Sequence, residues 1–96
     1  MDYRILFTQK ALNDLAELIS HIAEDDANAA SRFGNALPNH VDLLSRFPHM
    51  GTAIKSRSRV RKLVHSPIVV YYRIQDDKQA VEILQFWHGS RQVLDS

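Results

Sequence analysis

The sequence contains no cysteine among its 96 residues. Disulfide bonds, thiolate metal sites and thiol catalysis are therefore excluded. Its three glycines are widely scattered, so no glycine-rich loop can cradle a phosphate group, and the GxSxG and HExxH motifs are absent. No spacing typical of a metal site is found among the histidines His21, His40, His49 and His65. We therefore expect neither a metal nor another cofactor.

The sequence also lacks a long apolar run. No hydrophobic stretch approaches the roughly 18 residues that a membrane-spanning helix needs, and residues 1–4 do not resemble the start of a signal peptide. We expect a cytoplasmic protein with no membrane association. A hydrophobic content of 45% and a charged content of 24% are typical of a globular chain, and residues 1–96 suffice for one small domain.

Acidic and basic residues are unevenly distributed along the chain. Residues 1–50 hold four Lys or Arg against seven Asp or Glu, whereas residues 51–96 hold eight against four. Five cations and no acid fall between Lys55 and Lys62. Such a run often does no more than keep a surface loop solvated. It indicates a binding site only if other functional groups lie beside it in the fold.

Two amphipathic helices are predicted in the first half of the chain. After a β-prone segment at 3–7, Thr8 offers a hydroxyl N-cap for a helix that ends near Asp25. A second helix follows after a short break and stops at the Phe-Pro pair at 47–48, with a kink or local break expected at Pro38. The apolar stripes have helical spacing: Ala11, Leu15, Leu18 and Ile22, widened by Leu12 and Ile19, and then Ala30, Phe33, Leu37, Val41 and Leu44.

Three strands are predicted in the second half, after a loop at 49–58. The last two must pair as an antiparallel hairpin, because the turn between them leaves no room for a crossover. One face of the middle strand is apolar, and the other, with Val69, Tyr71 and Arg73, is polar only in part, so we expect partial cover there. The predicted fold is α+β in the order β-α-α-β-β-β, a helical hairpin packed on a small, mainly antiparallel, twisted sheet. The strands are expected at about 59–65, 67–75 and 80–87.

His88 and Arg91 are the first candidates for chemistry. An imidazole can act as a general acid or base near neutral pH, and a guanidinium can hold a phosphate through two parallel hydrogen bonds. The alternative is that both residues are structural: His88 would end a strand with a hydrogen bond, and Arg91 would be an ordinary surface cation.

A second group of candidates surrounds the basic strand. Alternation places Arg59 and Arg61 on one side and Lys62 on the other, and two adjacent arginines can hold phosphates or the carboxylates of a partner protein. The alternative is protection of an exposed sheet edge against aggregation. For Arg73 we favour a pairing with Glu82 across the last hairpin over exposure to a ligand.

An ordered set of short motifs resembles the RelE/ParE toxin superfamily of bacterial type II toxin–antitoxin modules. The set runs from about residue 3 to residue 91. The resemblance is closer to the ParE branch, because of the long helical hairpin, the Phe-Pro and Gly stop at 47–51 and the ending His88-Gly89-Ser90-Arg91. The motifs include Phe7-Thr8, Arg32-Phe33, Phe47-Pro48, Tyr72-Arg73-Ile74 and Ile83-Leu84.

The ParE resemblance implies a cytoplasmic toxin that inhibits DNA gyrase without being a nuclease and that a cognate antitoxin neutralises as a hetero-oligomer. The RelE branch instead implies a metal-independent endoribonuclease that cleaves messenger RNA on the ribosome. For that activity Arg59, Arg61, Arg91 and His88 would be the catalytic candidates. Ile68 stands where the RelE branch has an arginine, and residues 92–96 contain no tyrosine, which favours ParE. A third interpretation is a module that binds its antitoxin but is no longer toxic.

The antitoxin is expected to present an acidic amphipathic segment. Such a segment would cover apolar positions of the sheet and pair with the basic candidates. The candidate target- or antitoxin-binding residues are Arg59, Arg61, Lys62, Arg73, His88 and Arg91.

Overall fold

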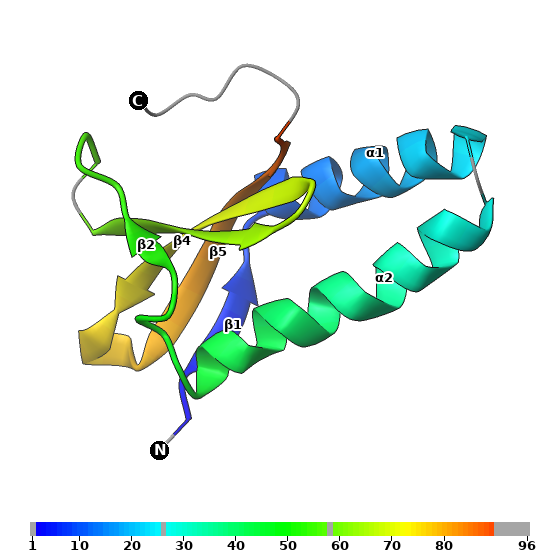
Figure 1. The fold of residues 1–96 in the computed structure, drawn as a ribbon. Helices are drawn as coiled ribbons and strands as arrows, with labels where there is room; N and C mark the ends of the chain where they lie inside the picture. Colours follow the sequence, from blue (N-terminus) through cyan, green and yellow to red (C-terminus); the bar gives the residue numbers. More distant parts are fainter. Residues whose placement is uncertain (1, 26, 58, 90–96) are drawn as a thin grey trace.

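The computed structural model describes residues 2–25, 27–57 and 59–89, and two helices lie against a five-stranded sheet in it (Figure 1). This confirms the predicted α+β class and the helical hairpin on a mainly antiparallel sheet. The helical elements are α1 (Gln9–Asp25), α2 (Ala27–Asp42) and the short 3-10 turns η1 (Leu43–Ser45) and η2 (Asp76–Lys78). The strands are β1 (Arg4–Phe7), β2 (Thr52–Ala53), β3 (Val60–His65), β4 (Ile68–Gln75) and β5 (Ala80–His88).

The strand order in the sheet is β1-β5-β4-β3-β2. Only β1 and β5 pair in parallel, and the other three pairings are antiparallel. Strand β2 lies within 49–58, so the prediction of an uninterrupted loop there was wrong. Thr52 and Ala53 pair with Lys62 and Arg61 at the edge of the sheet. Two residues leave too short a pattern for sequence periodicity to detect.

Helix α1 begins where it was predicted to begin. The Thr8 hydroxyl accepts the Ala11 backbone N–H at 3.1 Å and donates to the Ile83 carbonyl at 3.0 Å, so the cap also ties the helix to β5. Ala11 and Leu18 are buried as the stripe predicted. Leu12 is 46% exposed, so its assignment to the stripe was wrong. The stripe is narrower because one sheet covers only one side of the helix.

Helix α2 continues through Pro38 without an interruption. The prediction that the proline does not end the helix is confirmed, whereas the alternative of a local break at Pro38 was wrong. Pro38 is exposed, which keeps its ring on the solvent side. The helix ends at Asp42, and η1 completes the turn before Phe47. Leu37, Val41 and Leu44 are buried, while the side chains of Ile22, Ala30 and Phe33 lie outside the described part of the chain.

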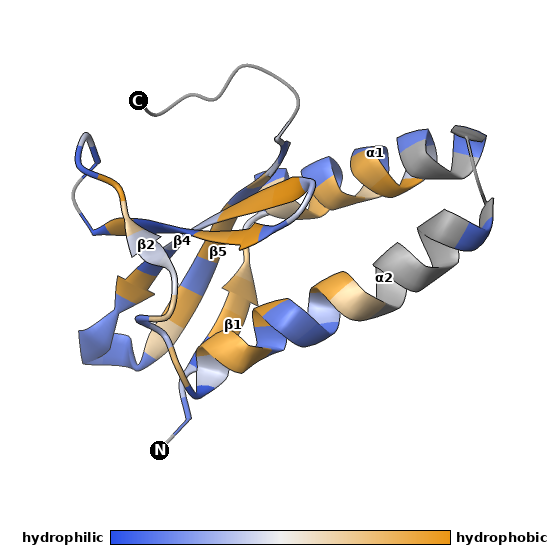
Figure 2. Cartoon of the chain, in the orientation of Figure 1, coloured by the Kyte–Doolittle hydropathy of each residue, from blue (hydrophilic) through white to orange (hydrophobic). Residues whose placement is uncertain are grey.

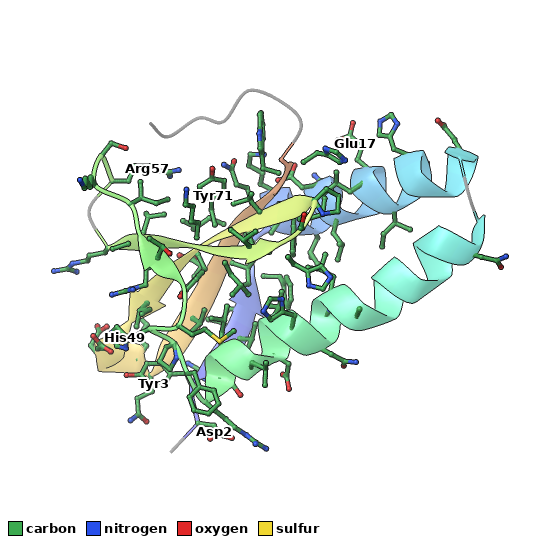
Figure 3. All side chains as sticks on the ribbon, viewed as in Figure 1. Asp2, Tyr3, Glu17, His49, Arg57 and Tyr71 are labelled. Atoms are coloured by element: carbon green, nitrogen blue, oxygen red, sulfur yellow. The ribbon has the colours of Figure 1, made fainter. Side chains whose placement is uncertain are left out.

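Two hydrophobic clusters lie on opposite faces of the sheet. Figure 2 shows the hydrophobic residues along the strands and helices that contribute to them. The larger, inner cluster joins the helices to β3, β4 and β5. The smaller, outer cluster contains Ile54, Val60 and Tyr71, and Figure 3 shows Tyr71 on the side of β4 away from the helices. The expected partial cover of the second face is thereby confirmed, and Ile54 supplies it from the loop after β2. Burial on both faces is what makes β4 apolar along most of its length.

Candidate functional site

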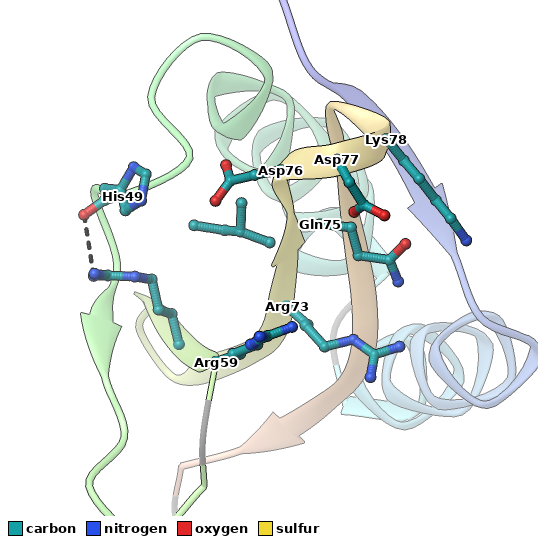
Figure 4. Close-up of a pocket in the computed structure, with 9 residues that line it drawn as sticks. His49, Arg59, Arg73, Gln75, Asp76, Asp77 and Lys78 are labelled. Carbon is teal, nitrogen blue, oxygen red and sulfur yellow. Dashed lines mark hydrogen bonds between the residues drawn. The ribbon is translucent and has the colours of Figure 1, made fainter.

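An open cavity of about 870 Å³ lies where β4 turns into β5, beside the loop at 48–51 (Figure 4). We call it the cationic pocket. Arg61 of β3, Arg73 of β4 and Arg59, which directly precedes β3, line it, and His49 lines it from the loop. The opposite wall is η2, which contributes Asp76, Asp77 and Lys78. The lining therefore contains four cations and two acids, and the arginine side of the pocket suits a carboxylate or a phosphate.

Arg59 reaches the pocket because the chain turns sharply before β3. Its φ of 65° lies in the left-handed region that non-glycine residues seldom adopt, and strand β3 begins only at Val60. Arg59 and Arg61 both line the pocket. Lys62 pairs in the sheet with Thr52 and Tyr71 and is absent from the pocket lining. The pocket thus brings together Arg59, Arg61 and Arg73 but not Lys62.

Arg61 and Tyr72 hold the loop that forms one side of the pocket. Arg61 Nη1 donates to the Gly51 carbonyl at 2.6 Å and to the His49 carbonyl at 3.3 Å. The Tyr72 hydroxyl donates to the Pro48 carbonyl at 2.7 Å and accepts the Gly51 N–H at 3.0 Å. Burial raises the pKa of the Tyr72 phenol, so it stays protonated and can donate. This arrangement could not be predicted from the sequence, because Arg61 and Tyr72 bind backbone groups of the loop.

Arg73 forms the ion pair with Glu82 that its cross-strand position predicted. The two residues are opposite each other in the β4–β5 register, and Arg73 Nη2 donates to Glu82 Oε1. Gln75 Nε2 donates to the same oxygen at 3.2 Å. The Arg73 side chain is nevertheless 44% exposed and lines the pocket, so it remains accessible to a ligand.

Removing the Arg73–Glu82 pair is expected to change stability little. Exposed ion pairs contribute about 0–1 kcal/mol, because water and salt screen them. Replacing Glu82 with glutamine keeps its shape, and we expect the free energy of unfolding in urea to fall by less than about 1 kcal/mol. A loss above about 2 kcal/mol would show that the pair organises the hairpin.

His88 lies elsewhere, in a small cavity of about 60 Å³ between α1 and β5. Lys10, Asp14 and Glu17 line that cavity from α1, and Figure 3 shows Glu17 far from His49. His88 follows Glu82 by six positions along β5, a span of about 20 Å in a strand. The structure therefore does not bring His88 to the cationic pocket. Arg91 lies outside the described residues.

The fold also brings together two histidines that their positions in the sequence keep apart. His40 of α2 and His65 of β3 are half-buried, with Nδ1 atoms 2.8 Å apart and ring centroids 5.0 Å apart. Burial first, and then the neighbouring His40, lower the pKa of His65 below its usual value of about 6.5.

The stability of the chain should therefore depend on His65 at mildly acidic pH. A folded-state pKa below the unfolded-state value means that the unfolded chain takes up the proton first. Stability is retained above about pH 6.5 and lost as the pH falls through the folded-state pKa. Urea unfolding between pH 7.5 and 5 should show a smaller loss for His65→Gln than for the native chain. Parallel curves for the two proteins would contradict this assignment.

In the part of the chain that the structure describes, no group of three or more His, Cys, Asp or Glu side chains could hold a metal ion. Nor does any helix among those residues have the length and apolar character needed to cross a membrane.

A two-helix hairpin on a mainly antiparallel sheet is the fold that the resemblance to the RelE/ParE superfamily implies. The family model of the ParE toxin of the type II toxin–antitoxin system parDE matches residues 5–93. The chain belongs to this family and is a toxin of a type II toxin–antitoxin system.

Individual relatives carry names from both branches of the superfamily. The chain is 36% identical over 90 residues to Y4kP of Sinorhizobium fredii, which is itself named only as a proposed toxin. The alignment covers 93% of this chain and 91% of that relative. The chain is 29% identical over 94 residues to toxin RelE1 of Caulobacter vibrioides, covering 96% and 99%. The chromosomal ParDE system of P. aeruginosa contains a chain of similar fold, with a TM-score of 0.75, 19% identity and coverage of 90% and 95%.

Proposed function

We propose that this toxin inhibits DNA gyrase through direct binding, with the cationic pocket as part of the contact surface. The match to the ParE family over residues 5–93 carries the proposal, since the ParE resemblance implies gyrase as the target. The pocket adds a physical reason. Arg59 and Arg73 are exposed cations beside a loop that Arg61 and Tyr72 hold in place, which preorganises a surface for acidic groups of a protein.

The direct test is a supercoiling assay with purified toxin, DNA gyrase and relaxed plasmid. We expect inhibition at micromolar toxin and recovery when the cognate antitoxin is added in equal amount. Unimpaired supercoiling at micromolar toxin would refute the proposal.

One observation favours ribonuclease activity as the second candidate. His49 lines the same pocket as the three arginines, so an imidazole lies beside groups that could stabilise a developing negative charge on phosphate. The histidine to test for this activity is therefore His49 in place of His88. An RNase toxin would produce cleavage inside codons on translating ribosomes, and His49→Ala would remove that cleavage while the fold remained intact.

We further propose that the cognate antitoxin covers the outer face of the sheet. Val64 is 56% exposed there, and Val69 and Trp87 are only partly buried. Gln85 Nε2 and Trp87 Nε1 are buried without a hydrogen-bond partner among the described residues, so two donors near this face are unsatisfied. Because the basic strand β3 lies beside this face, we expect the antitoxin segment that covers it to be acidic.

Affinity for the antitoxin should therefore fall with salt but not vanish. Raising the salt from 0.1 to 1 M shortens the Debye length from about 10 to 3 Å, which weakens the charge pairs and leaves apolar contacts in place. Titration calorimetry of the complex at several salt concentrations measures this. An affinity that does not change with salt would place the basic residues outside the interface.

A further inference from the structure

The contact between α2 and β3 contains two imidazoles whose ring nitrogens converge. The Nδ1 atoms of His40 and His65 are 2.8 Å apart, and their rings are tilted by 53°. At this distance one ring can donate an N–H to the other. Both nitrogens cannot carry a proton at the same time without repulsion, so at least one offers its lone pair to the point where the two rings meet.

The same separation suits a metal ion. Two nitrogen ligands at about 2.0–2.1 Å from one metal, at angles of 90° to 109°, lie about 2.9–3.4 Å apart. The two histidines would have to separate by only about 0.1–0.6 Å. We propose that His40 and His65 form a two-imidazole site for a divalent transition metal ion, which links α2 to β3.

The chemistry of the two side chains favours borderline ions. Neutral imidazole binds Zn²⁺, Ni²⁺ and Cu²⁺, whereas Mg²⁺ and Ca²⁺ prefer oxygen ligands. Imidazole is mostly neutral near pH 7, and the neutral form is the one that binds a metal. Both rings would then carry their proton on Nε2, and water would fill the remaining coordination positions.

Among the described residues, His40 and His65 belong to no group of three or more His, Cys, Asp or Glu side chains that could hold a metal ion, so the proposed site has these two ligands. Across the sheet His65 pairs with Ile68, and Ile68 pairs with His88, so His88 lies two strands away, or about 10 Å. On α2, Asp42 follows His40 by two residues and is exposed. A two-ligand site is open and exchanges its metal readily, so the ion would strengthen an existing contact without being required for folding. This inference is independent of the target of the toxin.

The test uses the full-length chain without a histidine tag. Zn²⁺ or Ni²⁺ should raise its midpoint of thermal unfolding in a concentration-dependent way, because the metal binds the folded state, whereas Mg²⁺ should leave it unchanged. His40→Gln and His65→Gln should each weaken the metal affinity by at least about tenfold. His49→Gln, at an exposed histidine in the cationic pocket, should retain it. The affinity should also fall below about pH 6.5, where protons compete.

A second measurement needs no substitution. The electron paramagnetic resonance spectrum of the chain with one equivalent of Cu²⁺ should show two nitrogen ligands. Fewer than two nitrogen ligands, or no metal-induced shift in the native chain, would reduce the pair to a hydrogen bond and overturn the proposal. An equal shift in the native chain and in both glutamine variants would place the metal elsewhere, with the same consequence.

Discussion

Replacing Gly51 with alanine should destabilise the chain by about 3 kcal/mol or more. A Cβ atom at this position would lie 2.6 Å from the Lys62 carbonyl oxygen and 2.6 Å from the Tyr72 hydroxyl. The carbonyl belongs to the sheet and cannot move aside alone, and displacing the phenol would break its hydrogen bonds to Pro48 and Gly51. For a domain of this size we expect a fall in the midpoint of thermal unfolding of roughly 10–25 °C.

Two comparison variants make the Gly51 experiment interpretable. Tyr72→Phe removes only the hydroxyl and should cost about 1–3 kcal/mol, because the buried Gly51 N–H loses its partner. Thr52→Ala changes an exposed neighbouring residue and should stay within about 0.5 kcal/mol of the native chain. If Gly51→Ala were as stable as Thr52→Ala, the loop would not be held in the way described above.

The double substitution Arg59→Gln and Arg73→Gln should abolish growth arrest while the chain stays folded. It removes two of the four cations that line the cationic pocket and leaves Arg61, which holds the loop, in place. We expect the toxin concentration that halves gyrase supercoiling to rise by at least about tenfold, because desolvated charge pairs at an interface are costly to break. The readouts are growth after induction and the supercoiling assay.

The matched control changes the same number of charges outside the pocket. Lys55 and Arg57 belong to the same basic run and are exposed, but neither lines the pocket. The double variant Lys55→Gln and Arg57→Gln should remain toxic. If the two double variants lost toxicity equally, net charge alone would matter, and the pocket would have no special role.

The helices and the central strands were predictable because local patterns encode them. Thr8 as a cap, the stripe through Ala11 and Leu18, and the apolar alternation of β4 each involve residues close together in sequence. The pairing of Arg73 with Glu82 was predictable for the same reason, since a hairpin fixes which residues face each other.

The cationic pocket could be predicted only in part. Arg59 and Arg61 were recognisable from the charge run, but the contribution of His49 depends on how the 48–51 loop folds back on β3 and β4. Arg61 and Tyr72 hold that loop through hydrogen bonds to its backbone carbonyls, and backbone carbonyls are present at every residue, so the sequence does not reveal these contacts. The meeting of His40 and His65 depends on helix-to-sheet packing across 25 residues, which periodicity does not encode.

The most direct test of the central claim is induction of the toxin without its antitoxin, with pulse-labelling of DNA and protein synthesis in the same culture. A gyrase inhibitor should stop DNA synthesis first, and the DNA-damage response should rise while protein synthesis continues. The Arg59→Gln, Arg73→Gln variant should abolish this effect. Protein synthesis that stops first would contradict the account and indicate a ribonuclease, and undisturbed growth would indicate a module that only binds its antitoxin.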